Sequence, residues 1–321
     1  GKYFPPFAGG MEHYLRDLMW AQSVQGADTR ALVHQSRLGL RSGEESFATG
    51  GSQLPVTRAA VWARVLFTPI SPTFPLLLRR LLRRDQPDLL HLHMPNVSAF
   101  WVLLVPAARR IPWVVHWHAD VLASEHSWGL RFFYRLYRPL ERALLRRCRA
   151  EIATSPPSLE SSVPLRPVRD KCHVVPLGLA ASATAAEDDS ACRPGGESAP
   201  LRILAVGRLT YYKGFAYLLR ACAQVDGAHL YLVGEGDERD SLQQLCAELD
   251  LGGRVSFLGH LSAEALAAEY AACDCLCLPS IERTEAFGMV LLEAMRWNKA
   301  TVVSDVPGSG MSWVVDHEVT G

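Results

Sequence analysis

Residues 280–295 read SIERTEAFGMVLLEAM, and they place Glu285 and Glu293 seven intervening residues apart. The segment follows a short apolar run at 275–279, and Gly288 introduces a helical pattern. We therefore predict a strand, a loop and a helix, with one carboxylate in the loop and the other two turns into the helix. Backbone N–H groups at the helix start lie between them and can bind an anion or sugar hydroxyls. Both carboxylates can then face one cleft.

Short apolar runs alternate with helical patterns along all 321 residues, which predicts an α/β fold with mostly parallel sheets. The small, polar, Pro- and Gly-containing segment 181–200 is the best linker. It separates a first domain at 1–180 from a second, incomplete domain at 201–321. The chain opens on a loop at 1–10 with no strand before it and stops after a turn, so we expect both ends to be truncated.

The expected elements are short and regularly spaced. In the first domain we predict strands at 88–93, 112–118, 151–155 and 172–176, and a helix at 129–147. In the second domain we predict strands at 203–206, 230–233, 255–258, 275–278 and 301–304, and a helix at 215–225.

Charge is distributed unevenly although the net charge is zero. Residues 1–180 hold 23 Lys and Arg against 13 Asp and Glu, whereas residues 181–321 hold 10 against 20. The net +10 of the first part suggests an anionic partner. Basic and apolar residues interleave at 79–84 and 131–147, as in helices that lie on anionic lipid, and a solvated helix face is the alternative. The chain shows no recognisable nucleic-acid module, so no nucleic-acid partner is expected.

The eight cysteines show no paired C-x-x-C spacing, so we expect reduced thiols in a cytosolic protein. Cys273, Cys275 and Cys277 alternate and would share one face of a strand. Core packing explains them better than a metal site, because free cysteine behaves as a small hydrophobe. No apolar run reaches the roughly 20 residues of a membrane-spanning helix.

Residues 207–214 form a loop between a predicted strand and a predicted helix, and they carry Arg208 and Lys213. A loop at the carboxyl end of a parallel strand is where α/β folds bind ligands. Arg208 offers a planar fork and Lys213 a mobile point charge, so together they can hold a diphosphate. The alternative is a pair of surface cations with no shared partner. The presence of Glu285 some 70 residues downstream favours the diphosphate interpretation.

Three glycine turns also follow or precede regular elements. Gly234 and Gly236 end one strand as a lone G-x-G, which is a weak dinucleotide signal, and we interpret it as a turn lining a nucleotide pocket. Gly259 ends the next strand, where backbone atoms could contact a base. Gly9 and Gly10 precede an amphipathic helix running to about residue 24, and their backbone can approach a phosphate or sugar closely. A plain turn is the alternative.

His118 ends the predicted strand at 112–118 and Asp120 follows it, and both could project into a cleft between domains. His91, His93 and His116 are interpreted as structural, because lone histidines more often are. A zinc site from His116 and His118 would need a third ligand that the sequence does not nominate. We therefore expect no metal site.

Together these residues resemble the retaining glycosyltransferases of family 4 over essentially the whole chain. The matching stretches are Gly9-Gly10, His118-Ala119-Asp120, Gly207-Arg208 with Lys213-Gly214, and Glu285-Ala286-Phe287-Gly288 with Glu293. The local style is most similar to bacterial mannosyl- and rhamnosyltransferases. The resemblance implies a GT-B fold, in which two Rossmann-like domains face each other, with an acceptor-binding first domain and a donor-binding second domain.

The resemblance also implies a role for each matching residue. Arg208 and Lys213 would hold the donor diphosphate, and Glu293 would bind the ribose hydroxyls. Glu285 would contact the transferred sugar, with the Phe287 and Gly288 amides on its hydroxyls or phosphate. The remaining implied contacts are made by His118 to the sugar, by Gly9 and Gly10 to the diphosphate or acceptor, and by Gly259 in the donor site.

The chemistry suits these residue types, because fixed cations stabilise the negative charge that develops on a departing diphosphate. The leaving group is already good, so no paired acid and base are needed as in glycoside hydrolysis. The resemblance implies retention by same-face attack assisted by the leaving phosphate. No Asp-x-Asp motif is evident, so we expect metal independence and no cofactor beyond the nucleotide-sugar substrate.

We therefore expect a cytoplasmic enzyme, peripheral on the inner face of the cell membrane, that moves a hexose from a nucleotide sugar to a lipid-linked or surface-glycan acceptor. GDP-mannose is the first candidate donor and a UDP-hexose the second. One alternative is a catalytically silent nucleotide-sugar-binding partner in a glycan-assembly complex. Another is a different two-domain enzyme, such as a nucleotide-sugar epimerase or a glycogen-type phosphorylase.

Overall fold

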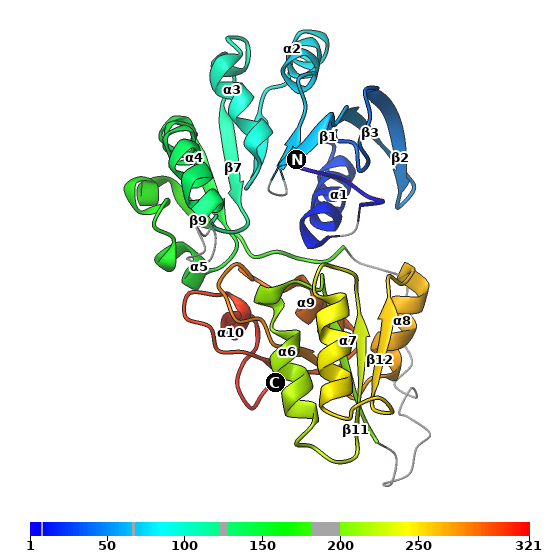
Figure 1. Ribbon diagram of the computed structural model, residues 1–321. Helices are drawn as coiled ribbons and strands as arrows, with labels where there is room; N and C mark the ends of the chain where they lie inside the picture. The colour runs from blue at the N-terminus through cyan, green and yellow to red at the C-terminus, as the bar shows by residue number, and fades with distance from the viewer. Residues whose placement is uncertain (8, 66–67, 122–127, 181–199) are drawn as a thin grey trace. The chain divides into compact units, whose positions relative to one another are not determined.

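The chain folds as two compact units, Gly1–Ala180 and Ala181–Gly321. The computed structural model describes residues 1–7, 9–65, 68–121, 128–180 and 200–321. The linker expected at 181–200 therefore lies outside the described residues except for its last position. Among the described helices, none is both long and apolar enough to cross a lipid bilayer. Figure 1 shows the elements of each unit.

Unit 1, residues 1–180, is built on a four-stranded parallel sheet in the order β6-β7-β8-β9. Its strands are β6 Leu90–Met94, β7 Trp113–Trp117, β8 Ala150–Ala153 and β9 Cys172–Val174. Each lies within two residues of a strand predicted from the sequence, so these four predictions are confirmed. The inward side chains are fully buried, among them Met94, Trp113 and Val115.

A second sheet in unit 1 was not predicted. Its order is β1-β3-β2, with β1 parallel and β2 antiparallel to β3. Its strands are β1 Ala31–His34, β2 Gly43–Thr49 and β3 Ser52–Ala59, and a separate hairpin joins β4 Ala63–Val65 to β5 Thr68–Ile70. β2 is mostly exposed and polar, so it lacks the apolar alternation that marks a strand. The signal that was present is the Gly50-Gly51 turn, because both glycines have positive φ, as a two-residue hairpin loop requires.

The first residues of unit 1 pair with β1 although they were expected to form a loop. The amino group of Gly1 donates to the carbonyl of Leu32 over 3.1 Å, and the His34 amide donates to the carbonyl of Lys2 over 3.0 Å. The segment therefore runs alongside β1 before the chain turns into the first helix.

The helices of unit 1 pack their apolar faces on these sheets. They are α1 Gly10–Val24, α2 Phe74–Asp85, α3 Trp101–Leu104, α4 Trp128–Arg147 and α5 Pro156–Ser161. In α2 the buried residues Phe74, Leu78 and Leu82 recur every four positions, which explains why this arginine-rich stretch is helical. The helices predicted at 129–147 and up to residue 24 are confirmed.

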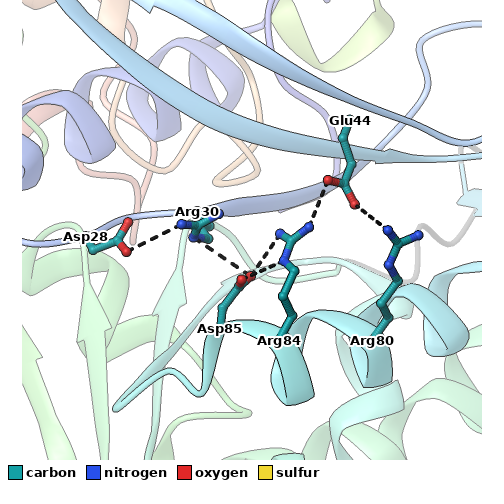
Figure 2. Close-up of polar contacts among 6 residues, drawn as sticks. All are labelled: Asp28, Arg30, Glu44, Arg80, Arg84 and Asp85. Carbon is teal, nitrogen blue, oxygen red and sulfur yellow. Dashed lines mark hydrogen bonds and ion pairs between the residues drawn. The ribbon is translucent and has the colours of Figure 1, made fainter.

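An ion-pair network joins α2 to β2 and to the segment before β1 (Figure 2). Arg84 reaches Glu44 over 2.9 Å and Asp85 over 2.6 Å, and Arg80 reaches Glu44 over 3.8 Å. Arg30 lies 3.8 Å from Asp85. Part of the basic face of α2 is therefore neutralised within the unit.

Unit 2, residues 181–321, contains one five-stranded parallel sheet in the order β12-β11-β10-β13-β14. Its strands are β10 Leu201–Val206, β11 Ala228–Val233, β12 Val255–Gly259, β13 Cys275–Leu278 and β14 Ala300–Val303. All five predicted strands are confirmed. The chain runs outward from β10 to β12 and then returns to place β13 on the other side of β10. The strand order therefore reverses between β10 and β13, which is where such sheets form ligand crevices.

Helices cover this sheet, and two apolar cores result. The helices are α6 Phe215–Cys222, α7 Arg239–Glu248, α8 Ala263–Ala272, α9 Met289–Arg296 and α10 Met311–Val314. Cys275 and Cys277 lie on β13, but Cys273 caps the end of α8 and packs in a different core from Cys277. The prediction that three cysteines share one strand face was therefore wrong, because the strand starts two residues after Cys273.

Candidate functional site

The β10–β13 switch point of unit 2 carries the two loops that the sequence singled out. The loop after β10 runs through Arg208 and Lys213 to the start of α6, and the loop after β13 runs through Glu285 to the start of α9. A backbone hydrogen bond of 2.8 Å from Ile281 to Tyr212 links them. Because both loops leave the carboxyl ends of neighbouring parallel strands, their polar side chains meet at one edge of the sheet.

Lys213 and Glu285 form an ion pair at this edge. The Lys213 Nζ contacts Glu285 Oε2, and the two side chains keep only 11% and 13% of their surface exposed. The hydroxyl of Ser280 lies 3.5 Å from the same carboxylate oxygen. A cation and a carboxylate are thus held together in a nearly dry position, where each interacts more strongly with a charged ligand than it would in water.

Arg208 differs from Lys213, although the sequence treats them as a pair. Its side chain is exposed, and within the described ranges it forms no ion pair with a carboxylate. Lys213 is 9% exposed and anchored, so it is a fixed charge, whereas Arg208 is free to swing onto a ligand. The structure places both on one loop but brings only Lys213 against Glu285.

Two glycines let these loops approach each other closely. Gly214 has φ +70°, and a Cβ there would lie 2.0 Å from the carbonyl oxygen of Pro279. Gly234 has φ +139°, and a Cβ there would lie 1.9 Å from the carbonyl oxygen of Gly207. The predicted glycine turn after β11 thus packs directly on the loop after β10.

Gly288 introduces α9, as predicted, with φ +83° at the N-cap. The adjacent Phe287 is 4% exposed, so its ring belongs to the core. Glu293 is the fifth residue of α9, a little over one turn from its start rather than the two turns expected, because the helix begins only at Met289. Gly259 ends β12, and its carbonyl accepts a 2.8 Å hydrogen bond from the Gly234 amide.

Residues to which the sequence assigned no role hold the two glutamates. The Tyr270 hydroxyl donates a 2.6 Å hydrogen bond to Glu293, and burial raises the pKa of Tyr270 well above its usual value, so the hydroxyl stays protonated. The Ser309 hydroxyl donates to the carbonyl of Glu285 and accepts from the Met311 amide. Tyr270 lies 23 residues before its partner on another helix, so no local pattern identifies it. Ser309 lies in the stretch Gly308-Ser309-Gly310, which the sequence alone links to neither glutamate.

In unit 1 four histidines line one face of neighbouring strands. His91 and His93 lie on β6, His116 lies on β7, and His118 directly follows β7. The rings stack: His116 and His118 are 4.4 Å apart with an interplanar angle of 1°. His93 Nδ1 lies 2.9 Å from His118 Nε2, within hydrogen-bonding distance.

Burial makes these imidazoles neutral. It lowers the pKa of His118 to about 3, of His116 to about 2 and of His91 to about 4, with neighbouring histidines adding to the effect at His116 and His118. Within the described residues, both ring nitrogens of His116 and the Nδ1 of His118 lack a hydrogen-bond partner. His118 can therefore offer a neutral donor or acceptor to a ligand, but it does not act as a charged acid near pH 7.

The third ligand that a zinc site would need is present, since nitrogens of His93, His116 and His118 lie within 4.8 Å of one another. Ligands of a tetrahedral zinc at about 2.0–2.1 Å have nitrogens about 3.3 Å apart and lone pairs that converge on the ion. Here the ring planes are parallel within 16°, so lone pairs that lie in those planes do not converge on one point. The arrangement suits a stack of neutral rings and does not fit a zinc centre.

α1 covers this histidine stack and begins at the predicted glycine pair. Tyr14 of α1 meets the rings of His116 and His118 edge-on at 5.2 and 5.7 Å. Gly9 is the N-cap of α1, and Gly10 is its exposed first residue. The start of α1 and His118 are thus parts of one packed assembly within unit 1.

Asp120 was expected to project into a cleft, but it is used inside unit 1. Its Oδ1 accepts a 2.8 Å hydrogen bond from the Trp117 indole and a 2.6 Å bond from the Ser162 hydroxyl. These bonds tie the segment after β7 to the end of α5. Asp120 therefore orients the backbone that carries His118.

The predicted residues thus form two groups. Arg208, Lys213, Glu285, Glu293 and the Phe287–Gly288 backbone lie on the two loops and on α9 of unit 2. Gly9, Gly10 and His118 lie together in unit 1.

Two family models match the chain. The model described as a glycosyl transferase 4-like domain matches residues 9–178, and the model described as glycosyl transferases group 1 matches residues 194–321. The first alone spans more than half of the chain. The two matches end and begin on either side of the boundary between the units.

Several curated proteins are similar to the chain. An uncharacterized glycosyltransferase, MJ1607 of Methanocaldococcus jannaschii, is 42% identical over 37% of this chain and 30% of its own length. D-rhamnosyltransferase WbpZ of Pseudomonas aeruginosa is 32% identical over 65% of this chain and 53% of its own. O-antigen chain mannosyltransferase C of Escherichia coli is 26% identical over 99% of this chain and 81% of its own. The chain therefore spans less than two thirds of the first two relatives.

Solved structures share the fold. Sucrose-phosphate synthase of Thermosynechococcus elongatus matches with a TM-score of 0.71 and 24% identity over 95% of this chain and 78% of that chain. Anabaena HepE, in complex with UDP and glucose, matches with a TM-score of 0.68 and 22% identity over 100% and 83%. The predicted two-domain α/β fold of the GT-B class is thereby confirmed.

Proposed function

This chain belongs to the glycosyltransferase 4-like family, and we propose that it is a retaining hexosyltransferase that uses a nucleotide sugar. The acceptor is a lipid-linked or surface glycan. A mannose-type sugar from GDP-mannose is favoured, because an O-antigen chain mannosyltransferase is similar over almost the whole chain. The observation that carries the proposal is the nearly buried Lys213–Glu285 pair at the β10–β13 switch point.

In this proposal Lys213 and Glu285 contact different parts of the bound donor. Lys213 and Arg208 hold the diphosphate, where fixed positive charge stabilises the negative charge that develops as the sugar departs. Glu285 faces the transferred sugar and accepts hydrogen bonds from its hydroxyls. The bond between C1 and the phosphate oxygen breaks with its electron pair on the diphosphate. An acceptor hydroxyl forms the new bond on the same face and gives its proton to a leaving phosphate oxygen.

The other residues orient the donor and the acceptor. Glu293, held by Tyr270, binds ribose hydroxyls, and the Phe287 and Gly288 amides at the start of α9 bind sugar hydroxyls or phosphate. His118 supplies a neutral hydrogen bond from unit 1, and Gly9 and Gly10 supply close backbone approach. Gly259 lines the nucleotide pocket. Two side-chain cations take the place that a metal ion has in other transferases, so we propose that no metal or cofactor is needed.

We also propose that α4 rests on an anionic membrane surface at the cytoplasmic side. Its apolar residues Phe132, Leu136 and Leu140 recur every four positions and are 61%, 61% and 42% exposed. Arg135 and Arg138 lie between them on the same helix. An exposed apolar stripe flanked by arginines matches the interface between acyl chains and anionic headgroups.

Calorimetric titration of the full chain with GDP-mannose, UDP-glucose, UDP-N-acetylglucosamine and dTDP-rhamnose tests the donor site. We expect one nucleotide sugar to bind with micromolar affinity. An Arg208→Ala/Lys213→Ala variant should weaken that binding at least 100-fold. A matched Arg220→Ala/Lys299→Ala variant loses the same charge away from the loops and should bind as the wild type does.

Two outcomes of this titration discriminate the alternatives. Absence of binding by a folded wild-type protein contradicts the proposal. Binding without hydrolysis or transfer of the sugar, in the presence of a membrane extract that supplies acceptors, favours the catalytically silent partner instead.

A further inference from the structure

A cavity of about 560 Å³ opens at the amino ends of three strands of unit 1. Trp113 begins β7, Arg149 directly precedes β8 and Lys171 directly precedes β9, and all three line the cavity. In a parallel sheet the amino ends lie at the edge opposite the carboxyl ends, where His118 follows β7. The cavity therefore lies at the opposite edge of the sheet from the histidine stack, and none of its lining residues belongs to the proposed donor site.

Positive charge dominates the lining of this cavity. The basic side chains that line it are Arg109, Arg110, Arg147, Arg149 and Lys171. No carboxylate lines it, and in the part of the chain that the structure describes none of the five forms an ion pair with one. A concave surface lined by one sign of charge focuses its field and raises the local concentration of the opposite ion.

Two of the five side chains are held in place by the fold. Lys171 Nζ donates to the carbonyls of Arg146 over 2.7 Å and Cys148 over 3.2 Å. The guanidinium of Arg147 donates to the carbonyl of Arg109 and lies 5.2 Å from the centre of the Trp113 ring. Trp113 is itself fixed by a 2.8 Å hydrogen bond to the carbonyl of Ala108. The cavity wall is therefore preorganised.

Capping of helix ends explains only part of the cluster. Cations are favoured at helix C-termini, and Lys171 and Arg147 bind carbonyls there. Arg109, Arg110 and Arg149 have exposed side chains, and no side-chain hydrogen bond is found for them within the described residues. Three guanidinium groups thus converge on the cavity with their donors available.

We propose that this cavity binds a ligand that carries two or more phosphate groups. The planar donor fork of arginine matches phosphate oxygens in a bidentate way, and the lysine adds a point charge. The volume lies in the range of small-molecule sites and exceeds what a single phosphate requires. The phosphates belong either to a soluble polyphosphorylated molecule or to a lipid headgroup, and this second site is independent of the donor diphosphate.

The test is calorimetric titration with inorganic tripolyphosphate, pyrophosphate and orthophosphate. All proteins carry Arg208→Ala/Lys213→Ala, which removes the proposed donor site from the measurement. We expect one tripolyphosphate per chain, bound at least tenfold more tightly than orthophosphate. Arg109→Ala/Arg149→Ala should weaken it at least tenfold. Arg37→Ala/Arg41→Ala, on the exposed segment between β1 and β2, removes the same charge and should change it less than twofold.

Vesicles of phosphatidylcholine with a few per cent phosphatidylinositol bisphosphate distinguish the two sources. Loss of vesicle binding in the Arg109→Ala/Arg149→Ala variant, with no response to soluble polyphosphate, supports the cavity and assigns it to a headgroup. Response to tripolyphosphate alone assigns it to a soluble ligand. The proposal is overturned if the cavity variant and its control weaken tripolyphosphate binding equally, or if the protein binds neither tripolyphosphate nor the vesicles.

Discussion

The carboxyl edges of the two parallel sheets carry different kinds of polar side chain. In unit 1 the side chains are neutral, whereas in unit 2 they form an ion pair. In unit 1 the edge carries stacked histidines whose pKa values burial lowers, so they are neutral at pH 7. In unit 2 it carries Lys213 and Glu285, which form a nearly buried ion pair. The same architecture therefore offers neutral hydrogen bonds at one edge and fixed charge at the other. In the function proposed above, the first edge serves sugar hydroxyls and the second serves a diphosphate.

The largest expected effect comes from removing the fixed charge of unit 2. Lys213→Ala should lower kcat about 100- to 1,000-fold, because the developing charge on the diphosphate loses a preorganised partner. Steady-state transfer assays with the donor identified above measure this, and Arg220→Ala is the control. A decrease below tenfold in a variant that melts like the wild type would show that the charged edge is structural.

A smaller effect is expected from the neutral edge of unit 1. His118→Ala should lower kcat/KM about 10- to 100-fold, since one hydrogen bond to the sugar is lost and its partner is left unsatisfied. The exposed His173 provides the control, His173→Ala. Because the pKa of His118 is about 3, the wild-type rate should show no histidine titration between pH 5.5 and 8.5. A rate that rises or falls with an apparent pKa near 6.5 and loses that titration in His118→Ala contradicts the neutral state.

Lowering the pH should decrease the free energy of unfolding, because the buried histidines are kept neutral in the folded state. Their folded pKa values lie below the unfolded value of 6.5, so the unfolded state binds more protons and stability falls as pH drops below 6.5. His116→Phe should reduce that slope by about 1.4 kcal/mol per pH unit between pH 6 and 4.5, because one buried titration is removed. Urea denaturation at several pH values measures the slope, whatever the variant's absolute stability. An unchanged slope would mean that His116 titrates normally.

The smallest effect is expected at the exposed ion pairs of α2 (Figure 2). Glu44→Gln should cost less than about 1 kcal/mol and less still in 1 M salt, because Glu44 and its partner Arg84 are about 40% exposed. Arg84 holds the pKa of Asp85 below its usual value, so the contribution of that pair is present above pH 4 and is lost as pH falls further. Chemical denaturation at two salt concentrations measures the first effect, and denaturation at two pH values measures the second. A cost above about 2 kcal/mol would show that surface pairing matters as much here as at the nearly buried Lys213–Glu285 pair.

Local pattern was enough to predict the parallel sheets of both units. Strands such as β7 and β11 are short, apolar and bounded by turn residues, and these signals lie within the strand itself. β2 escaped prediction because an edge strand facing solvent needs no apolar face. The prediction that three cysteines share one strand face failed because the strand begins at Cys275, so Cys273 lies at the end of a helix.

The candidate site was predictable where its charged residues lie on loops that directly follow predicted strands. Arg208, Lys213 and Glu285 follow strand ends, and the carboxyl ends of parallel strands meet at one edge. Tyr270 was not predictable, since its contact with Glu293 depends on how α8 packs beside α9. The use of Asp120 inside unit 1 was not predictable either, because its partner Ser162 lies 42 residues away.

The amino-acid sequence by itself determined the α/β class, the segments that form the parallel strands and the loops that carry charged residues. These features follow from short-range periodicity and turn chemistry. Only the tertiary structure decided that Lys213 is paired and nearly buried while Arg208 is exposed. It also decided that four histidines stack as neutral rings and that five cations gather at the opposite edge of their sheet. Protonation state and charge pairing depend on burial and on neighbours distant in sequence, and both arise only when the strands are laid side by side.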